Sequence, residues 1–399
     1  MIFPIILFSL LRCISSFNLS DAIINTYNGI KERNIYSYNI HLVHRPFSEF
    51  PGDIVSEGLG YGLLASLYMD DHETFQTLLE NAEGRMWTGQ YYNWHLDENG
   101  NVQDIGGATD AEEDIALSLI FASYKIETNQ WPATHYDFYK TRAQDIVNNL
   151  WNARMISENG YICPGSNWGC DEFVNPSYFS PAWYKIFSAF DNQNHDWDTV
   201  IHKNYELLEK TVGYDNGLIP DWTTIYGGFV ENNHLGYNAY GDGRYFFKDA
   251  IRILFRIGVD YLWFRDTRAE KYLKNAKQFI MNLGGAEKAN FFRLFPDYNL
   301  PEEDVWIFDQ GQRTRKRREH SHMTIAMWAI PVFLFGNASE KNTFLDELSK
   351  FYETNQTYWG KTNDPINNED IYHNEMYFDQ FLALFGAMIM NNSFFNIMP

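Results

Sequence analysis

The sequence predicts an all-α fold in which about six helical hairpins close into an (α/α)6 barrel. Helical periodicity recurs along the chain, strand-like alternation is scarce, and no Pro- or Ser-rich linker divides it. The 399 residues are 45% hydrophobic, which is enough for one large core. Antiparallel pairs of about twelve helices can form an inner ring, an outer ring and a mouth built from loops. A generic all-α domain would give a similar helix count.

Turn residues separate the expected helices, and the helices are not recognisable as sequence repeats. In chain order we expect helices over residues 21–35, 57–69, 72–85, 110–124, 136–155, 182–190, 198–212, 244–264, 270–283, 324–335, 341–355 and 374–390. Long loops rich in Trp, Tyr, Asn and Gly span residues 87–109 and 160–181. Loops of this kind commonly carry function on a rigid scaffold.

The first residues resemble a secretory signal. The apolar run 1–11 is too short for a membrane span and suits the apolar region of a signal peptide, although Arg12 follows it and no basic residue precedes it. The alternative is a buried N-terminal helix or strand. We therefore expect a signal peptide over residues 1–16, a single catalytic domain over residues 17–399, and a secreted protein. Cys163 and Cys170 would then remain, either as a small-loop disulfide or as two free thiols.

The composition narrows the possible partners. A net charge of −21 disfavours nucleic acid and anionic membranes, whereas neutral or cationic polymers are compatible with it. Aromatic residues make up 17% of the chain, and flat rings are suited to stacking on sugars. The histidines are scattered, and a close loop pair such as His320 and His322 is more often incidental than a metal site. We expect no metal, no cofactor and a monomer.

Glu57 stands in an unusual heptapeptide, Ser-Glu-Gly-Leu-Gly-Tyr-Gly, residues 56–62. We expect the glycines to let a large ligand approach the backbone. An apolar helical run follows directly, so the carboxyl group should lie in an apolar setting that raises its pKa. A carboxyl group placed in this way can donate or accept a proton, provided that other carboxylates converge on it.

A second acidic cluster begins another expected helix, at residues 107–116. Its simplest interpretation is local: Thr109 and Glu112 have the spacing of a capping box, and acidic residues in a first turn complement the helix dipole. Asp110 is nevertheless positioned to face the loops. A carboxylate at a helix N-terminus stays ionised and can accept hydrogen bonds from a ligand rich in hydroxyl groups.

Asp249 and Arg252 are three residues apart in an expected apolar helix, so they can pair on one face. Such pairs are usually structural. Because the flanking residues are nearly all apolar, this pair should be buried or line a cleft. An arginine partner keeps an aspartate ionised and oriented, as a general base must be.

Two carboxyl groups in different environments are what glycoside hydrolysis needs. One stays protonated and donates to the leaving oxygen, while the other stays ionised and activates water or attacks the sugar. The surroundings favour Glu57 for the first role and Asp249 for the second.

Five segments together resemble glycoside hydrolase family 8, whose members are inverting, endo-acting enzymes on β-1,4-linked polysaccharides with an (α/α)6 barrel. They occur in the family's order, and the resemblance covers roughly residues 20–390. The segments are residues 56–62, 108–116, 175–184, 217–222 and 249–252.

The resemblance implies roles for particular residues. Glu57 is similar to the general acid and Asp249 to the general base that activates water. Asp110 is similar to the residue that holds the sugar at the cleavage point and favours its distorted ring. Arg252 and Tyr178 are similar to the groups that orient the base.

The resemblance also implies aromatic contacts with substrate. Trp94 and Trp168 are similar to stacking platforms, and we expect Tyr61, from the Glu57 heptapeptide, to contact the substrate. The chain departs from the family at Glu112, where Asp is usual. It also has Leu254 and Phe255 where the family has Pro and Trp.

We therefore expect a polysaccharide partner and an endo-β-1,4-glucanase acting on cellulose or β-glucan. The loop before Asp110 is closer to the endoglucanases of the family than to its reducing-end xylanases. The alternatives are a xylan-cleaving member of the family and a non-catalytic carbohydrate-binding protein on the same barrel. A polysaccharide lyase would need a Tyr/His or Arg/Lys grouping that these segments lack.

Overall fold

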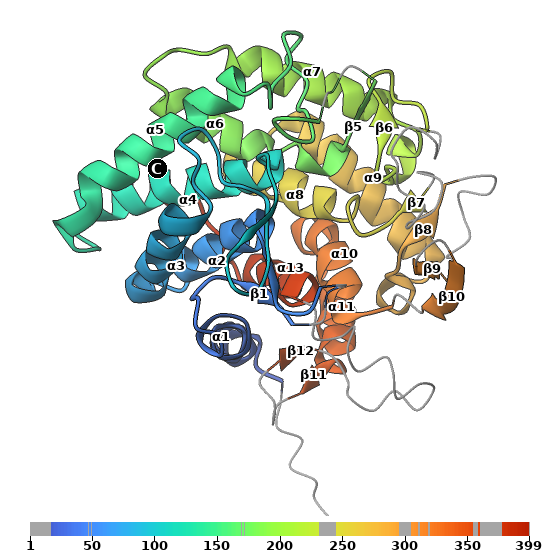
Figure 1. Ribbon diagram of the computed structural model, residues 1–399. Helices are drawn as coiled ribbons and strands as arrows, with labels where there is room; N and C mark the ends of the chain where they lie inside the picture. The colour runs from blue at the N-terminus through green and yellow to red at the C-terminus, as the bar shows by residue number, and fades with distance from the viewer. Residues whose placement is uncertain are drawn as a thin grey trace, which may run out of the picture.

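The computed structural model (Figure 1) describes residues 17–46, 48, 50–168, 170, 172–230, 245–294, 305–309, 312–317, 320–353, 358–359 and 377–398. The α-helices of these residues are α1 (Leu19–Ile30), α2 (Ser56–Tyr68), α3 (His72–Arg85), α4 (Thr109–Glu127), α5 (Tyr136–Asn152), α6 (Pro181–Phe190), α7 (Trp197–Lys210), α8 (Arg252–Phe264), α9 (Thr267–Leu283), α10 (His322–Phe335), α11 (Ala338–Ser349) and α13 (Tyr377–Met390). The expected signal peptide, residues 1–16, lies outside the described residues.

Six of the helices form a closed inner ring. Helix α2 packs against α4, α4 against α6, α6 against α8, α8 against α10, α10 against α13, and α13 returns to α2. An outer helix backs each of them: α3 behind α2, α5 behind α4, α7 behind α6, α9 behind α8, α11 behind α10 and α1 behind α13. In Figure 1 the outer helices lie around the periphery and the inner ones at the centre. The expected (α/α)6 barrel is confirmed.

The two rings differ in how their side chains are buried. Nearly every residue of α4 and α10 is buried, so these inner helices present apolar side chains on all faces. Helix α9, in the outer ring, alternates buried residues such as Tyr272, Leu273 and Ala276 with exposed polar ones. The core therefore fills the inner ring and the layer between the rings.

The strands are short and lie in the loops. One antiparallel sheet has the order β1-β2-β3-β4, and the remaining strands pair two by two. Their bounds are β1 (His44–Arg45), β2 (Asp53–Val55), β3 (His95–Leu96), β4 (Val102–Asp104), β5 (Phe173–Val174), β6 (Thr223–Thr224), β7 (Tyr245–Phe246), β8 (Phe292–Arg293), β9 (Val305–Asp309), β10 (Gln312–Arg317), β11 (Tyr352–Glu353) and β12 (Tyr358–Trp359). Strand β2 leads directly into α2, so the four-stranded sheet fixes the start of that helix.

Two predicted helix boundaries are wrong. The helix expected from residue 244 begins only at Arg252, because Tyr245 and Phe246 form strand β7 and a turn follows it. Asp249 lies in this turn, so its pairing with Arg252 occurs at the N-terminus of α8. The helix expected over residues 341–355 spans Ala338–Ser349, starting with an Asn337 capping box and giving way to β11.

Candidate active site

The functional residues expected from the sequence gather where inner helices begin. Glu57 and Asp110 are the second residues of α2 and α4, and Arg252 is the first residue of α8. Tyr178 ends the short 3-10 helix η3 (Pro176–Tyr178), two residues before the N-cap of α6. Helix N-termini present backbone N–H groups and a positive dipole end, which suits a cluster of carboxylates.

Close helix packing explains the glycines around Glu57. A Cβ atom on Gly60 would lie 2.9 Å from the Cβ of Asp114 on α4, and one on Gly62 would lie 2.8 Å from a methyl group of Val43. Real Cβ atoms do not approach so closely, so these positions exclude side chains. The expectation that the glycines admit a ligand is wrong: they let α2 pack against α4 and the chain before it.

Arg252 connects the three carboxylates. Its Nη1 donates to Glu57 Oε2 at 2.6 Å and to Asp110 Oδ2 at 2.7 Å, while Nη2 donates to Asp249 Oδ1 at 2.9 Å. The arginine is fully buried, and Tyr178 lies beside it with its ring centre 5.1 Å from Cζ. The structure thus brings together the five residues that the sequence singled out for the reaction.

One guanidinium therefore spans the gap between Glu57 and Asp249. Because each carboxyl group binds a different Nη atom, their nearest oxygens lie within about 8 Å of each other. This limit overlaps the roughly 6.5–9.5 Å that separates acid and base in inverting glycosidases. The two side chains differ in access to solvent: Asp249 is 37% exposed and Glu57 is 18% exposed.

Burial dominates the electrostatics of Glu57. Burial and, to a lesser extent, the nearby Asp110 raise the pKa of Glu57 to about 7, against the lowering effect of Arg252. Burial also raises the pKa of Asp110, opposed by the charges of Arg252 and Arg256. The simple expectation that Asp110 stays ionised because it begins a helix thus misses the larger cost of burying it.

The expected stacking residues lie beside the carboxylates. The Ser56 N–H donates to the carbonyl oxygen of Trp94 at 2.9 Å, so this tryptophan is held next to the start of α2. Trp168 lies four residues after Pro164, whose carbonyl oxygen accepts a hydrogen bond from the Thr109 N–H at 3.2 Å. This contact holds the loop of Trp168 beside the start of α4. The two indole rings meet edge to face with centroids 5.8 Å apart. Within the described residues, Trp94 Nε1 is buried and has no hydrogen-bond partner.

The prediction that Tyr61 contacts the substrate is wrong. Its side chain is 1% exposed, and its ring packs on Phe378, Phe381 and Phe385 of α13. A ligand in the barrel mouth cannot reach a ring placed between two inner helices. Tyr61 belongs to the core, with its hydroxyl group buried and unpartnered among the described residues.

The capping box expected at α4 is absent. Glu112 does not return to its own helix end: its Oε1 accepts from the Tyr92 N–H at 2.7 Å, and the Thr109 hydroxyl has no partner among the described residues. Burial raises the pKa of Glu112 to about 8. The side chain is only 1% exposed, and at this departure from the family's Asp it connects α4 to the loop before Asp110 through Tyr92.

Sequence reasoning missed Tyr377. It is the first residue of α13, and its hydroxyl donates to Glu57 Oε1. Arg45 also lies near both side chains, held by Asp53 of strand β2 through two hydrogen bonds, with a separation of 2.9 Å from Nε to Oδ1. No local pattern could have indicated this contact, because Tyr377 and Glu57 are 320 positions apart.

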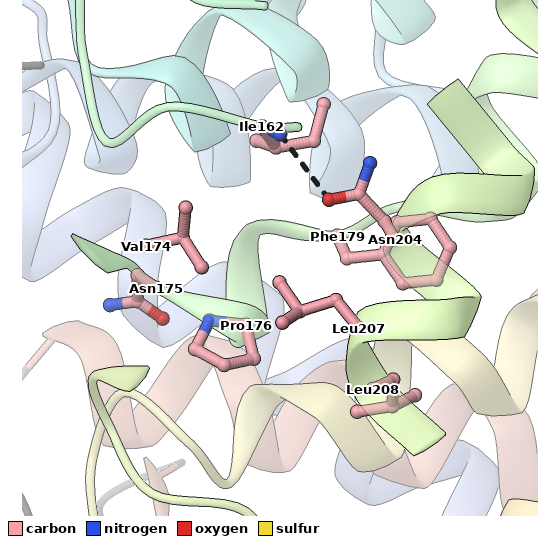
Figure 2. A pocket seen from close by; sticks show the side chains of 8 residues that line it. All are labelled: Ile162, Val174, Asn175, Pro176, Phe179, Asn204, Leu207 and Leu208. Atoms are coloured by element: carbon pink, nitrogen blue, oxygen red, sulfur yellow. Dashed lines mark hydrogen bonds between the residues drawn. The ribbon is translucent and has the colours of Figure 1, made fainter. Parts of the chain in front are cut away.

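A separate small cavity lies behind the loop that carries Tyr178. Its volume is about 10 Å³, room for about one water molecule, and it lies between α7 and the segment before η3. Figure 2 shows Asn204 turned toward the Ile162 N–H, which it accepts at 3.3 Å. The remaining lining is mainly apolar: Val174, Pro176, Phe179, Leu207 and Leu208, with Asn175. This cavity is a packing gap that holds no catalytic group.

Three further observations concern the described residues. They contain no group of three or more His, Cys, Asp or Glu side chains that could hold a metal ion, and His320 binds Ala289 O at 2.7 Å and Glu347 at 3.1 Å. No described helix has both the length and the apolar character needed to cross a bilayer. Cys163 and Cys170 form a disulfide.

Carboxyl groups paired at a distance that admits a water molecule are typical of inverting glycoside hydrolases, and comparison with known proteins identifies the family. The sequence model described as "Glycosyl hydrolases family 8" matches residues 11–290. The chain belongs to this family.

The relatives by sequence include two clostridial endoglucanases. The chain is 37% identical to Endoglucanase 2 of Ruminiclostridium josui over 78% of its own length and 61% of the relative's. It is also 37% identical to Endoglucanase C of Ruminiclostridium cellulolyticum, over 59% of the chain and 48% of the relative. The chain thus spans about half to three fifths of the length of these relatives.

Solved structures share the fold. A variant of a reducing-end-xylose releasing exo-oligoxylanase superposes with a TM-score of 0.72, covering 96% of both chains at 18% identity. The xylose complex of a Rex8A variant from Paenibacillus barcinonensis gives 0.69 at 19% identity, covering 95% of this chain and 94% of that one. These similarities support the same barrel architecture.

Proposed function

We propose that this protein is an inverting, endo-acting glycoside hydrolase that cleaves β-1,4-linked glucan. The observation that carries the proposal is the grouping of Glu57, Asp110 and Asp249 on the single guanidinium of Arg252. Three carboxylates on one positive charge leave an excess of negative charge in a buried place. Such a cluster takes up a proton readily, and glycoside hydrolysis requires a carboxyl group that is still protonated near neutral pH.

Glu57 serves as the general acid. Its pKa of about 7 keeps a large fraction protonated near neutrality, and its proton passes to the oxygen of the bond being broken. Asp249 serves as the general base: it removes a proton from a water molecule, whose oxygen attacks the anomeric carbon from the opposite face. Its 37% exposure gives water access to it, while the hydrogen bond from Arg252 holds it in place.

Asp110 positions the sugar at the cleavage point. It is 3% exposed and shares Nη1 of Arg252 with Glu57, so it is fixed close to the acid. A rigid carboxylate there can accept hydrogen bonds from sugar hydroxyls and favour a distorted ring. Arg252 and Tyr178 orient the base, and Trp94 with Trp168 offers stacking surfaces along the bound chain.

Glucan is the preferred substrate class because of the relatives. Those at 36–37% identity are named endoglucanases, whereas the reducing-end xylose-releasing exo-oligoxylanase Rex8A of Paenibacillus barcinonensis is 29% identical. Xylan is the second candidate, favoured by the solved structures of that group, which share the fold.

We also propose that the protein is secreted and acts as a monomer. The apolar N-terminus and the Cys163–Cys170 disulfide support an oxidising, extracellular setting. Expression of the full chain in a secreting host, with N-terminal sequencing of the extracellular product, tests the first point. Cleavage near residue 16 is expected, and retention of residues 1–16 in the cell-associated protein would contradict it. Light scattering after size exclusion tests the second.

Product analysis on four polymers tests the reaction and the substrate together. Carboxymethylcellulose, barley β-glucan, xylan and chitosan are digested in parallel, and the first products are followed by NMR. We expect internal cleavage of the glucans and a product of α configuration. A β-configured first product would overturn inversion, and faster xylan cleavage would replace the substrate. If no polymer is cleaved but oligosaccharides bind, the protein is a non-catalytic binder.

A further inference from the structure

Both oxygens of Glu57 accept hydrogen bonds in this structure. Arg252 Nη1 donates to Oε2 at 2.6 Å, and the Tyr377 hydroxyl donates to Oε1. Two donors and no acceptor favour the ionised form of this carboxyl group, in opposition to the burial that raises its pKa. A general acid must instead carry a proton on an oxygen that can face the glycosidic oxygen, so one of these contacts has to change during the reaction.

The two donors differ in what they permit. A guanidinium carries only donors and does not lose its charge, whereas a phenolic hydroxyl can rotate and can also accept. Arg252 is in addition fixed by Asp110 and Asp249 and lies beside the rings of Tyr178 and Phe378. Oε2 is therefore permanently matched to a donor, and Oε1 is the oxygen that can carry the proton.

We propose that Tyr377 is a positioning residue for the general acid: in the free protein its hydroxyl holds the place on Oε1 of Glu57 that the glycosidic oxygen of a bound glucan takes. On binding, the hydroxyl leaves Oε1, and this oxygen carries a proton that the carboxylate has taken up from solvent. As the glycosidic C–O bond breaks, this proton moves to the leaving oxygen, while water adds to the anomeric carbon and loses a proton to Asp249. This inference rests on the proposed hydrolase function.

Several groups other than Tyr377 also influence the pKa of Glu57. Helix α2 itself contributes Tyr61, α4 contributes Asp110, the turn before α8 and its first residue contribute Asp249 and Arg252, and β1 contributes Arg45. The charges of these neighbours remain when the Tyr377 hydroxyl is removed. The hydrogen bond from Tyr377 favours the ionised form, and it lowers the pKa of Glu57 against the larger raising effect of burial.

The test is the pH dependence of the Tyr377→Phe variant of the full chain on soluble β-glucan. The alkaline limb of kcat/KM reports Glu57 in the free enzyme, and the limb of kcat reports it in the complex. Removing a donor from the carboxylate makes ionisation harder, so the kcat/KM limb should move up by about one pH unit. The kcat limb should stay where it is in the wild type, because the hydroxyl has already left.

The other outcomes overturn the proposal in different ways. Movement of both limbs means that Tyr377 remains on Glu57 in the complex, and movement of neither means that its role is only structural. Tyr61→Phe is the matched control, since it removes a buried hydroxyl that has no hydrogen bond to Glu57. It should leave both limbs unmoved.

A second variant covers the case in which Tyr377→Phe does not fold. Replacing Tyr377 by 3,5-difluorotyrosine keeps its size and makes the hydroxyl a stronger donor, so the kcat/KM limb should move down. An unchanged limb would overturn the proposal. A wild-type protein that cleaves none of the polymers defeats the proposed function instead, so the two failures are distinguishable.

Discussion

Helices α4 and α8 are joined by two Asp–Arg pairs that have opposite character. Arg256 binds Asp114 through both nitrogens, with 2.8 Å from Nη2 to Oδ2, and one turn away Arg252 binds Asp110 at 2.7 Å. All four side chains are almost completely buried. The first pair is balanced in charge. In the second, one arginine must also satisfy Glu57 and Asp249.

The difference separates anchoring from chemistry. Asp114 also accepts from the indole N–H of Trp183 at 2.7 Å, so its oxygens are matched by donors and the pair locks the two helices together. The Arg252 cluster cannot be neutral without taking up protons, and burial together with the charge of Asp110 raises the pKa of Glu57. The contact between α4 and α8 thus includes a stabilising pair and, one turn away, the pair that meets the proton donor Glu57 of α2.

The largest effect should come from Glu57→Gln, which keeps the shape of the side chain but removes its proton. We expect kcat on β-glucan to fall by about a thousandfold, since general acid catalysis contributes about 10²–10⁴. Oligosaccharide binding, measured by calorimetry, should persist. Glu112→Gln is the control with the same chemical change on α4, and it should remain active. A loss of less than tenfold in Glu57→Gln would remove Glu57 from the role of acid.

A comparison of Asp114→Asn with Asp110→Asn tests the contrast in stability. The first leaves Arg256 buried without its carboxylate partner and should cost about 3 kcal/mol of unfolding free energy. The second leaves Arg252 with Glu57 and Asp249 and should cost less than about 1 kcal/mol, while activity is lost. Urea unfolding followed by tryptophan fluorescence measures both. Equal costs would show that the excess charge at Arg252 does not matter for stability.

The pH dependence of activity should reflect the unbalanced cluster. With a Glu57 pKa of about 7, kcat/KM should fall about tenfold for each pH unit well above 7. The free energy of unfolding should also fall with rising pH. The folded protein keeps the Glu57 proton up to about pH 7, whereas the unfolded chain releases it near pH 4.5, so the stabilisation is lost as the pH rises from about 4.5 to 7. A rate profile and unfolding curves at several pH values check both. An alkaline limb of kcat/KM with its midpoint below pH 5.5 would contradict the raised pKa of Glu57.

The smallest effect is expected for Glu112→Gln, outside both pairs. At pH 6 the buried carboxyl group is already mostly protonated, so the amide should change stability by less than about 1 kcal/mol. Above pH 8 the variant should be the more stable protein, because the raised pKa of Glu112 costs the wild type stability between about pH 4.5 and 8. A difference in unfolding free energy between variant and wild type that stays constant from pH 6 to 9 would contradict this prediction.

The helices were largely predictable because their apolar periodicity is local. The exception before α8 arose because Phe246 and Phe247 look like part of an apolar helix, whereas Phe246 pairs in strand β7 with Phe292 of β8. No local pattern announces a partner strand that is so distant in sequence. Asp221 has a similar long-range role, since it accepts from the N–H groups of Phe247 and Ala250 at 3.0 and 2.8 Å and shapes the turn.

The site was predictable only in part. The spacing of three residues indicated the Asp249–Arg252 contact, and the local sequence around Glu57 and Asp110 marked them as candidates, for which the family resemblance supplied roles. That Arg252 also reaches Glu57 depends on ring closure across 195 positions, which spacing cannot convey. Tyr377 was missed for the same reason. The glycines beside Glu57 were misinterpreted because close helix packing and close approach of a ligand both require glycine, so the sequence alone does not distinguish them.

The contact between α2 and α13 has a consequence for synthesis on the ribosome. Glu57 emerges early, but its hydrogen-bond partner Tyr377 follows 320 residues later. Until that last inner helix has left the exit tunnel, the ring is open and the apolar faces of α2 and α10 lack their neighbour. Such long-range closure slows folding. A nascent chain should therefore gain its complete acid site only after α13 has emerged from the ribosome.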